Sequence, residues 1–600
     1  MKGIKPIALW LVALLTIAIT LLFVESDFLW KLQQNNLFLY SSLFFKQQMT
    51  VPGGMLTYLG TFFTQFFYHP WIGVVILCGW WLLLMWLVKR TFCIPDQWNI
   101  LTLIPVAILL VANMNLGYWI YVMKYSGQFF LTTIGTTAGV ALLWAYRKLS
   151  SKHWARIAYM LLVVVVGYPL MGVYALVSAL LMGVWAWRFS SNRLQNMVLS
   201  IVTILVVMIV PLMYYRFVYY HINIVDIYDT LLPDYIFVED YSNYLFPYYL
   251  LVVFFLTFIL FHFQYNSRPI PRWVGQCVLL VVLIACVWHF WYKDGNFHHE
   301  LRMQRCIEAC DWEGVIEEGR KQVDEPTRAI VMMRNLALSR LGRQCDEMYN
   351  FPKGSVRSNT KLPIFMFITV GRLVNYQYGL MNECHRICME DGVEYGWSVE
   401  LLQYMARAAI MSNEPQLARN YLNLLRQTHY YGDWADHMEC LIDNPNLIKN
   451  DKEAGPITHM MQYEDIHSKG NGYVEVNLMT MLSHIDSDDP YFQEQAVLAA
   501  MWTRDSHNFW PRFDRYIDLH PDTPVPRIIQ EAARLFGHLD HLPVEFLPFD
   551  KSVNDSFNGF MSLMEKLQGQ PVALMKDFLY QQYGNTYYYE YFLQRDITYY

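Results

Sequence analysis

Residues 7–24 read IALWLVALLTIAITLLFV, an apolar run without a charged side chain. The hydrocarbon core of a bilayer is about 30 Å thick, and a helix rising about 1.5 Å per residue crosses it in roughly 20 residues. The run is therefore long enough to span a membrane. It follows Lys2 and Lys5, as in a secretory signal, but it is too long for one and no small-residue cleavage site follows. We interpret it as an uncleaved signal anchor.

Similar apolar runs recur up to residue 292. They are Trp71–Val88, Asn99–Tyr121, Phe129–Tyr146, Arg156–Trp187, Met197–Tyr215, Phe246–Phe263 and Trp273–Trp291. The run Arg156–Trp187 is too long for one helix and is broken at Gly167-Tyr168-Pro169, so we expect two short helices in a hairpin there. The sequence thus predicts about nine spans, or eight if that run crosses only once.

Lysine and arginine flank these spans unevenly, and both prefer the cytoplasmic side of a membrane. With a cytoplasmic N-terminus, twelve of them fall inside: Lys2, Lys5, Lys89, Arg90, Arg147, Lys148, Lys152, Arg156, Arg188, Arg193, Arg268 and Arg272. Only Lys31, Lys46, Lys124 and Arg216 fall outside. With nine spans the C-terminal half lies outside the cytoplasm, and with eight it lies inside.

The net charge changes sign near residue 293. Residues 1–292 carry a net charge of +8 and the remainder −14, which together give −6. This division predicts an all-α protein, in which a polytopic transmembrane helix bundle precedes a soluble domain. The predicted domains are a transmembrane domain at 1–292 with an interfacial first loop at 25–70, a linker at 293–297, a helical-repeat domain at 298–541 and an aromatic-rich helical extension at 542–600. No long basic stripe with interleaved aromatic residues is present, so we expect no nucleic-acid partner.

From residue 298 onward the pattern is one of amphipathic helices joined by short turns. Ser398–Met411 and Gln416–Arg426, for example, are separated by Ser412-Asn413-Glu414-Pro415, with the proline placed to begin the second helix. The succession resembles tetratricopeptide repeats over about residues 298–445, although its spacing is irregular. We therefore expect a soluble tetratricopeptide-like α-solenoid, whose surface binds a protein or peptide. A scaffold without a ligand is the alternative. The aromatic end, Tyr587–Tyr600, packs either on this solenoid or on the bilayer.

The spans contain no Asp, Glu, Lys or Arg near their middle, which argues against an ion-driven carrier. Any chemistry should lie in the two long external loops, Glu25–Pro70 and Arg216–Tyr244. Motifs of nucleotide-binding, serine-hydrolase and zinc-protease sites are missing. His298-His299-Glu300 and the pair His538/His541 are too isolated to indicate a metal site, so we expect no metal and no other cofactor.

The ten cysteines are spread through both halves. Cys306/Cys310 and Cys384/Cys388 are each spaced by one helical turn. Buried positions on helix faces explain this spacing better than a zinc site does, although disulfides are an alternative in an oxidising compartment.

The run Pro52-Gly53-Gly54-Met55-Leu56-Thr57-Tyr58-Leu59-Gly60, followed by Thr64-Gln65-Phe66-Phe67-Tyr68 and Pro70, resembles an uncharacterised family of multi-pass membrane proteins of gut Bacteroidota. That family is known only as a domain of unknown function. The likeness is strongest over about residues 25–75, and the layout of spans followed by a helical domain extends it over the chain. The resemblance implies a Gram-negative inner-membrane protein with its second domain in the periplasm. It implies no activity.

A second likeness is to the C-type (GT-C) membrane glycosyltransferases, which carry an acid-x-acid motif in a long first external loop. Glu25 and Asp27 match that motif in residue type and position. In this resemblance they would be the catalytic residues, since one carboxylate can act as general base while another holds a divalent metal or the acceptor. Arg216 and Asp226 of the second loop would then bind the substrate, a polyprenyl-phosphate-linked sugar. Ordinary interfacial charge is the alternative for Glu25 and Asp27.

Two functions therefore follow from the sequence. The first is an inner-membrane protein of the cell envelope that presents a periplasmic helical-repeat domain for protein interaction. The second is a GT-C-like glycosyltransferase at the periplasmic membrane face. The first is preferred because its main requirements, apolar spans and amphipathic helices, are visible in the sequence.

Overall fold

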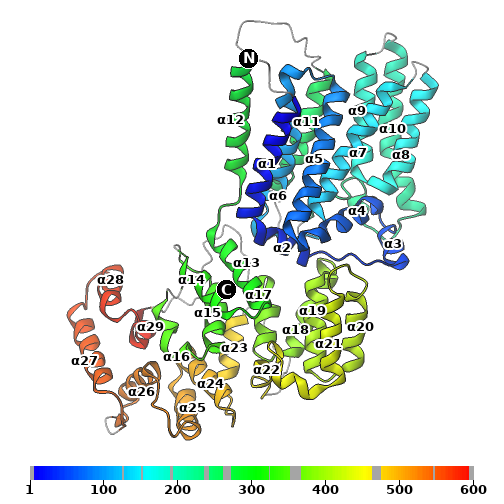
Figure 1. The fold of residues 1–600 in the computed structure, drawn as a ribbon. Coiled ribbons are helices and arrows are strands. Elements are labelled where there is room, and N and C mark those ends of the chain that lie inside the picture. The colour runs from blue at the N-terminus through cyan, green and yellow to red at the C-terminus, as the bar shows by residue number, and fades with distance from the viewer. Residues whose placement is uncertain are drawn as a thin grey trace. The chain divides into compact units, whose positions relative to one another are not determined.

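The computed structural model describes residues 6–124, 127–149, 153–189, 193–234, 242–260, 272–322, 325–351, 354, 366–462, 474–544 and 547–593. Within these ranges every regular element is an α-helix or a short 3-10 helix, which confirms the predicted all-α class. The chain divides into two compact units (Figure 1). Unit 1 comprises Met1–Lys293, Asp391–Leu401 and Asn423–Ala435, and unit 2 comprises Asp294–Glu390, Leu402–Leu422 and Asp436–Tyr600.

Unit 1 contains a helix at each predicted apolar run. The long helices are α1 (Pro6–Val24), α5 (Pro70–Phe92), α6 (Leu103–Met114), α7 (Gln128–Lys148), α8 (His153–Met171), α9 (Val173–Phe189), α10 (Arg193–Phe217), α11 (Ser242–Leu260) and α12 (Arg272–Phe290). In the described part of the chain, four helices (α5, α7, α8 and α10) are long and apolar enough to cross a membrane, or up to six if two bent helix pairs each count as one span. This is compatible with a membrane protein. The count of nine spans stays a prediction.

The run at 156–187 forms two helices, α8 and α9, that pack against each other. The chain reverses at Gly172, whose φ of +54° is a conformation that only glycine adopts without strain. Its N–H donates a hydrogen bond to the Tyr168 carbonyl at 2.9 Å. Pro169 lies inside the last turn of α8. The hairpin is thus confirmed, but its turn comes after the predicted Gly167-Tyr168-Pro169, because a proline near a helix end does not by itself reverse the chain.

Several cations assigned to the cytoplasmic side stand in the last turns of helices and lie over aromatic rings. The Arg147 guanidinium is 4.3 Å from the Trp185 ring centre, and the Lys148 ammonium is 4.2 Å from that of Trp144. Lys2, Lys5, Lys152, Arg268 and the side chains of Arg193 and Arg272 lie outside the described residues. Which end of unit 1 faces the cytoplasm stays a prediction.

The two long loops that were predicted to share one side meet in the structure. The first loop contains α2 (Ser26–Gln34), α3 (Ser42–Gln48), α4 (Gly54–Thr64) and the 3-10 helix η1 (Gln65–Tyr68). The Gly53 N–H donates to the Pro169 carbonyl at 3.0 Å, so the first loop contacts the α8–α9 turn. The Val173 N–H on that turn donates to the carbonyl of Thr230 in the second loop at 3.5 Å. The first and second loops therefore meet at the α8–α9 turn.

Unit 2 is a succession of short helices, many of which pack on the next in sequence. They are α13 (Gly295–Glu308), α14 (Trp312–Arg320), α15 (Arg328–Arg340), α16 (Gln344–Glu347), α17 (Met366–Gln377), α18 (Met381–Glu394), α19 (Val399–Met411), α20 (Pro415–Leu425), α21 (Gly432–Asp443), α22 (Ala454–Thr458), α23 (Val474–Ser483), α24 (Pro490–Thr503), α25 (Ser506–Leu519), α26 (Arg527–Leu539), α27 (Lys551–Lys566), α28 (Val572–Tyr583) and α29 (Tyr587–Leu593). Parts of α18 to α21 fall in unit 1. The tetratricopeptide-like solenoid stays a prediction.

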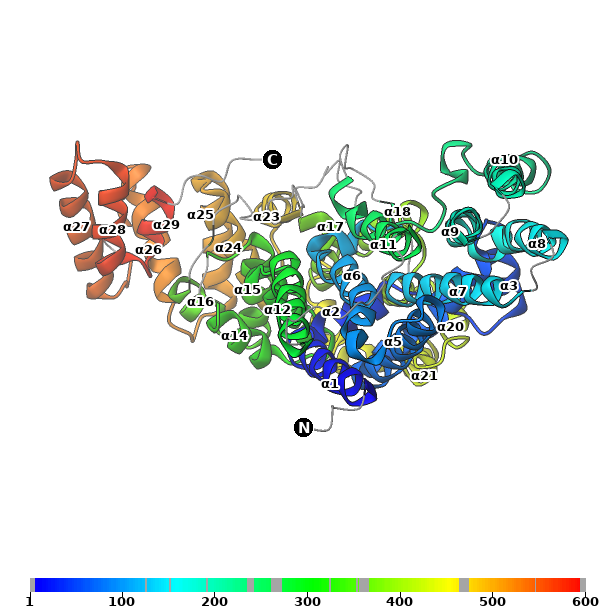
Figure 2. The same cartoon turned by 90° about the horizontal axis from the view of Figure 1, so that it is seen from above.

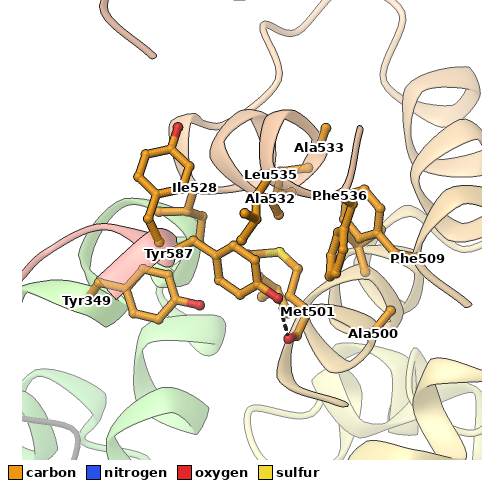
Figure 3. Packing of buried hydrophobic residues seen from close by; sticks show 14 of the residues in the cluster. Tyr349, Ala500, Met501, Phe509, Ile528, Ala532, Ala533, Leu535, Phe536 and Tyr587 are labelled. Carbon is orange, nitrogen blue, oxygen red and sulfur yellow. Dashed lines mark hydrogen bonds between the residues drawn. The ribbon is translucent and has the colours of Figure 1, made fainter. Parts of the chain in front are cut away.

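The aromatic end of the chain packs into the core of unit 2 as far as residue 593. Tyr587 and Tyr588 are fully buried, and they belong to the same apolar cluster as Phe509 and Phe536. The Tyr587 hydroxyl donates to the Met501 carbonyl at 2.7 Å (Figure 3). Of the two alternatives for this segment, the described residues therefore show packing on the helical domain.

Candidate functional site

The first loop carries the two predicted catalytic residues on a short buried helix. Glu25 is the residue before α2 and Asp27 lies in its first turn. Only 3% of Glu25 and 2% of Asp27 is exposed. The indole N–H of Trp291, the residue after α12, donates to the Glu25 carboxylate at 2.7 Å. Both side chains are therefore almost entirely buried.

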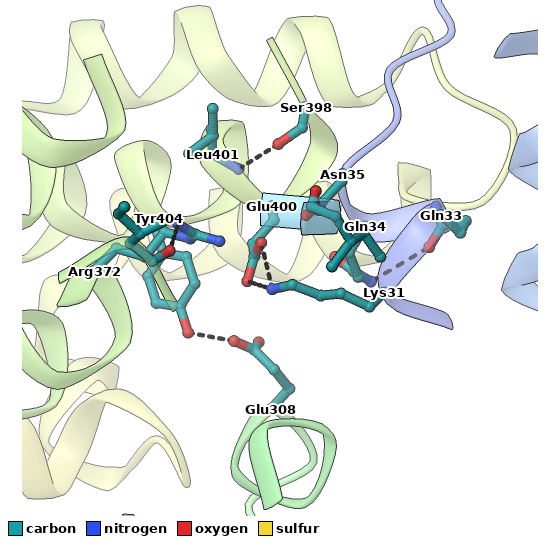
Figure 4. Close-up of polar contacts among 12 residues, drawn as sticks. Lys31, Gln33, Gln34, Asn35, Glu308, Arg372, Ser398, Glu400, Leu401 and Tyr404 are labelled. Atoms are coloured by element: carbon teal, nitrogen blue, oxygen red, sulfur yellow. Dashed lines mark hydrogen bonds and ion pairs between the residues drawn. The ribbon is translucent and has the colours of Figure 1, made fainter. Parts of the chain in front are cut away.

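The same helix buries a lysine. Lys31 is fully buried, and its ammonium lies 2.8 Å from each carboxylate oxygen of Glu400 (Figure 4). It also lies 4.9 Å from the centre of the Tyr121 ring. Its charge therefore faces a carboxylate of the same unit.

Further polar contacts extend this network along the first loop. The Tyr431 hydroxyl donates to the Gln33 side-chain oxygen at 2.7 Å, and the Gln34 amide donates to the same hydroxyl at 3.0 Å. The Val399 N–H donates to the Asn36 carbonyl at 3.1 Å. The network thus ties the first loop to the two later segments of unit 1, 391–401 and 423–435.

The predicted substrate-binding residues lie elsewhere in unit 1. Arg216 is exposed in the last turn of α10, and Asp226 is half-buried in the 3-10 helix η4 (Val225–Ile227). α10 packs on α8 and α9, whereas α2 packs on α1, α5 and η1. Figures 1 and 2 both show α2 and α10 in different parts of unit 1. The structure does not bring Arg216 and Asp226 together with Glu25 and Asp27, and the catalytic role of the acids stays a prediction.

The two histidine groups seen in the sequence do not form a metal cluster in the described residues. No group of three His, Cys, Asp or Glu side chains there could hold a metal ion. His299 Nδ1 lies 2.8 Å from the carboxylate of Glu318 on α14, so its ring takes part in a contact between α13 and α14. Cys384 and Cys388 are both fully buried on α18.

Unit 2 encloses a cavity of about 50 Å³ that is lined by charged groups. The charged residues are Arg328, Arg334, Arg504, Glu475 and Glu590, and we call this space the arginine cavity. Helices α15, α16, α23, α24 and α29 contribute to it, together with the segment around Tyr349, Tyr378 after α17 and Arg504 after α24. Side chains far apart in the sequence therefore converge on one place.

Local sequence explains how α15 and α24 present their arginines. α15 begins after Thr327, whose hydroxyl accepts a hydrogen bond from the Ile330 N–H at 3.3 Å. α24 ends at Arg504, which adopts a left-handed φ of +59° and so turns the chain at the rim of the cavity. The Arg504 guanidinium donates to the Glu590 carbonyl at 3.1 Å.

Arg328 forms a close ion pair with Glu475, in which the Arg328 Nε donates to Glu475 Oε2 at 2.8 Å. The second guanidinium nitrogen contacts the other carboxylate oxygen, so the pair is bidentate. Burial alone would lower the pKa of Arg328, but Glu475 raises it above its ordinary value. Arg328 is therefore positively charged at neutral pH.

Arg334 is the most deeply placed of the three arginines, with 1% of its surface exposed. Its guanidinium carbon lies 4.8 Å from the centre of the Phe351 ring. Burial and, to a smaller extent, the charge of Arg328 lower the pKa of Arg334 to about 9. It remains positively charged at neutral pH.

The rest of the lining is apolar or aromatic and includes Met332, Leu498, Met501 and Trp502. Tyr349 is buried beside them, and burial raises the pKa of its hydroxyl well above its usual value, so it stays neutral. The cavity thus combines guanidinium groups with an apolar wall. This arrangement can hold a small anionic group attached to an apolar one.

A model of the family described as "Family of unknown function (DUF6057)" matches residues 2–595. The chain belongs to this family. The match covers both units and confirms the predicted membership of an uncharacterised family. No curated protein and no solved structure matches the chain significantly.

Sequence reasoning missed the arginine cavity of this DUF6057 protein, because its charged residues are spread from 328 to 590 and form no motif. One local signal was present. Residues 328–340 read RAIVMMRNLALSR, in which Arg334 stands among apolar residues on a helix that is otherwise buried. A buried arginine is uncommon unless it has a partner, so that position indicates either an internal ion pair or a ligand site.

Proposed function

We propose that this DUF6057 protein is a multi-pass membrane protein of the bacterial inner membrane that binds a protein partner through its second unit. In this proposal the N-terminus is cytoplasmic, and unit 2 is a periplasmic domain of tetratricopeptide-like helical repeats. The arginine cavity is the observation that carries the proposal, since it is a concave, polar and apolar site built from several helices of that unit.

The surface of unit 1 supports a place in the membrane. Large apolar side chains are exposed along α1, α10 and α12, among them Leu15, Met208 and Val281. In water, continuous apolar surface of this kind causes aggregation, whereas in a bilayer it contacts the lipid chains. Of these helices, α10 is long and apolar enough to cross a bilayer by itself, and α1 and α12 qualify only as parts of bent helix pairs.

The composition of the cavity supports binding over a purely structural role. Taking a charged group out of water is costly, and an apolar side chain of similar volume usually stabilises a core better than an ion pair does. Charged groups around an internal space favour a binding site, because they select and orient what enters it.

The geometry supports the alternative, a lipid-linked sugar transferase, less well. A general base has to reach the acceptor hydroxyl, yet Glu25 and Asp27 are both buried. Lys31, which could neutralise a lipid phosphate, faces Glu400 instead. Only the sugar-transferase function would need a divalent metal.

Site-specific photo-crosslinking in intact cells tests the proposal. A photoreactive residue at Met479, half-buried in the cavity lining, should yield one discrete adduct with another polypeptide. The same residue at Glu317, exposed on α14 of the same unit, is the matched control and should yield none. The double variant Glu25→Gln/Asp27→Asn should still form the adduct at Met479, because the two acids take no part in partner binding in this proposal.

Two results would contradict the proposal. One is the absence of a polypeptide adduct at Met479 in cells that contain the folded protein. The other is the transfer of sugar from a polyprenyl-phosphate donor by the purified protein, with loss of that transfer in the Glu25→Gln/Asp27→Asn variant. The second result would establish the transferase instead.

A further inference from the structure

We infer that the outer face of α3, formed by Leu43, Phe45 and Lys46, lies in the headgroup region of the membrane and contacts phospholipid. The inference rests on the proposed function, because it requires unit 1 to be in a bilayer. It goes beyond that function by naming the part of the first loop that touches lipid. The sequence predicts an interfacial loop over all of 25–70, whereas the structure separates a buried part from an exposed part.

The two parts of the loop differ in what they expose. Every residue of α2 from Asp27 to Gln34 is buried, so this helix offers no surface to lipid. In α3, by contrast, Leu43 is 64% exposed, and Phe45 and Lys46 are exposed as well. Transfer of the leucine and phenylalanine side chains from water into an apolar medium is favourable. The outer face of α3 therefore gains free energy where hydrocarbon is within reach.

The opposite face of α3 fixes how the helix is oriented. The Ser41 hydroxyl accepts a hydrogen bond from the Phe44 N–H at 3.2 Å and so caps the first turn. Phe44 is buried, and its ring centre lies 5.5 Å from that of Phe38. A helix of seven residues is too short to be stable by itself, so this packing holds it in place. Leu43 and Lys46, three positions apart, then share one exposed side.

The neighbours of α3 indicate its level relative to a bilayer. α3 packs on α4, and α4 packs on α8. The N–H of Gly53, between α3 and α4, donates to the carbonyl of Pro169 in the last turn of α8. α8 is long and apolar enough to cross a membrane, as is α5, which begins at Pro70 directly after the first loop. The loop thus connects the ends of two such helices, and Figures 1 and 2 both show α3 beside this end of α8.

The residue types of this surface suit the boundary between hydrocarbon and water. Aromatic side chains concentrate at that level, where leucine and phenylalanine reach the acyl chains and a lysine ammonium stays among the phosphates. Tyr68 and Trp71, at the start of α5, are also exposed and are of the same kind. Phospholipid offers phosphate groups directly beside hydrocarbon, which matches Lys46 next to Leu43. Phospholipid is therefore the occupant that the surface fits.

Photo-crosslinking in vesicles tests the inference. The full-length protein is reconstituted with phosphatidylethanolamine and phosphatidylglycerol whose phosphate is radiolabelled, and a photoreactive residue is placed at Leu43. The same residue at Leu205, exposed on α10, is the positive control, and at Leu574, exposed on α28 of unit 2, it is the matched control. We expect Leu43 and Leu205 each to acquire at least about fivefold more labelled lipid than Leu574.

Two results overturn the inference. One is labelling at Leu205 while Leu43 acquires no more lipid than Leu574, and the other is a crosslink from Leu43 to a second copy of the chain in place of lipid. Both would leave unit 1 in the membrane. Absence of labelling at Leu43 and Leu205 alike would instead contradict the membrane location in the proposed function. If the Leu43 variant does not unfold with a transition like that of the parent, Lys46 on the same side of α3 takes its place.

Discussion

Lys31 has its ammonium group 2.8 Å from each oxygen of the Glu400 carboxylate, and its side chain is fully buried. The Glu400 side chain is 11% exposed. A buried pair of this kind is weak evidence for high stability, because removing both charges from water costs nearly as much as their attraction returns. Removing only one partner is destabilising, because the other charge then stays buried without its counter-ion.

We therefore predict that Lys31→Met lowers the free energy of unfolding by about 3–5 kcal/mol. Lys46→Met removes an exposed lysine of the same loop and should change it by less than about 0.5 kcal/mol. Thermal unfolding of the two variants in detergent, followed by tryptophan fluorescence, measures the difference. Equal changes in the free energy of unfolding for both variants would show that the Lys31–Glu400 pair does not hold the first loop in place.

At the scale of elements, α13 and α14 are joined by the Glu318 carboxylate. It lies 2.8 Å from His299 Nδ1, 3.1 Å from a nitrogen of Arg302 and 3.1 Å from Lys321 Nζ. Burial alone would raise the pKa of Glu318, but these three partners together lower it below its ordinary value of 4.5. The stabilisation is therefore present above about pH 4.5 and is lost as the pH falls through the folded-state pKa.

Glu318→Gln should accordingly lower the stability at pH 7 by about 1 kcal/mol, since its partners are partly exposed. The difference in stability between this variant and the parent should become smaller as the pH drops below 4.5. Glu317→Gln, at the exposed neighbouring position, is the control and should follow the parent at every pH. Melting temperatures of Glu318→Gln and the parent, measured across this pH range, test the prediction. A difference in melting temperature that stays constant with pH would show that ionised Glu318 does not stabilise the contact between α13 and α14.

A second contact between elements depends on a glycine. Gly53, before α4, has a φ of +80°, and a Cβ atom there would lie 2.3 Å from Leu231 Cδ1 in the second loop. Any side chain at this position is therefore strained by its backbone and collides with its neighbour. The close approach of the two loops requires glycine here.

Gly53→Ala should destabilise unit 1 by about 1–3 kcal/mol. Gly79→Ala is the matched substitution in α5, where the added Cβ would meet nothing within 4 Å. It should be neutral or up to about 1 kcal/mol stabilising, because alanine is the better helix former. Thermal unfolding of the two alanine variants provides the comparison, and a Gly53→Ala variant as stable as the parent would argue against the packing of these loops.

At the scale of the whole molecule, the proposed function places the two ends of the chain on opposite sides of a membrane. That follows from nine spans and a cytoplasmic N-terminus, both of which are predictions from the sequence. The run at 156–187 forms two helices, of which α8 is long and apolar enough to span a membrane and α9 is a shorter apolar helix, so the number of spans stays a prediction.

Fusions at residues 1 and 600 test this topology. A fluorescent protein that matures only in the cytoplasm should be active at the N-terminus, and alkaline phosphatase, which is active only in the periplasm, should be active at the C-terminus. Activity of the same reporter at both ends would mean an even number of spans. Unit 2 would then be cytoplasmic, and its partner would have to be sought there.

Helix positions could be predicted because they depend on neighbouring residues. An apolar run such as 7–24 specifies a helix by its own composition, and a nearby glycine such as Gly342 ends one, so the helices of unit 1 and the outline of unit 2 were already visible. The reversal at Gly172 was displaced from the predicted position by a few residues, which is the usual uncertainty of an element boundary. Membership of a family of unknown function was likewise apparent from the motif around Gly53.

The contacts between distant residues could not be predicted in this way. Lys31 and Glu400 are 369 positions apart, and the arginine cavity draws its charges from α15, α23, α24 and α29. Which side chains meet depends on how whole helices pack, and one sequence contains no record of that packing. Composition and periodicity therefore determined that the chain is helical and apolar in its first half, because those properties are local. Only the tertiary structure decided that Glu25 and Asp27 are buried and that three arginines surround one small space, because burial and proximity arise from packing.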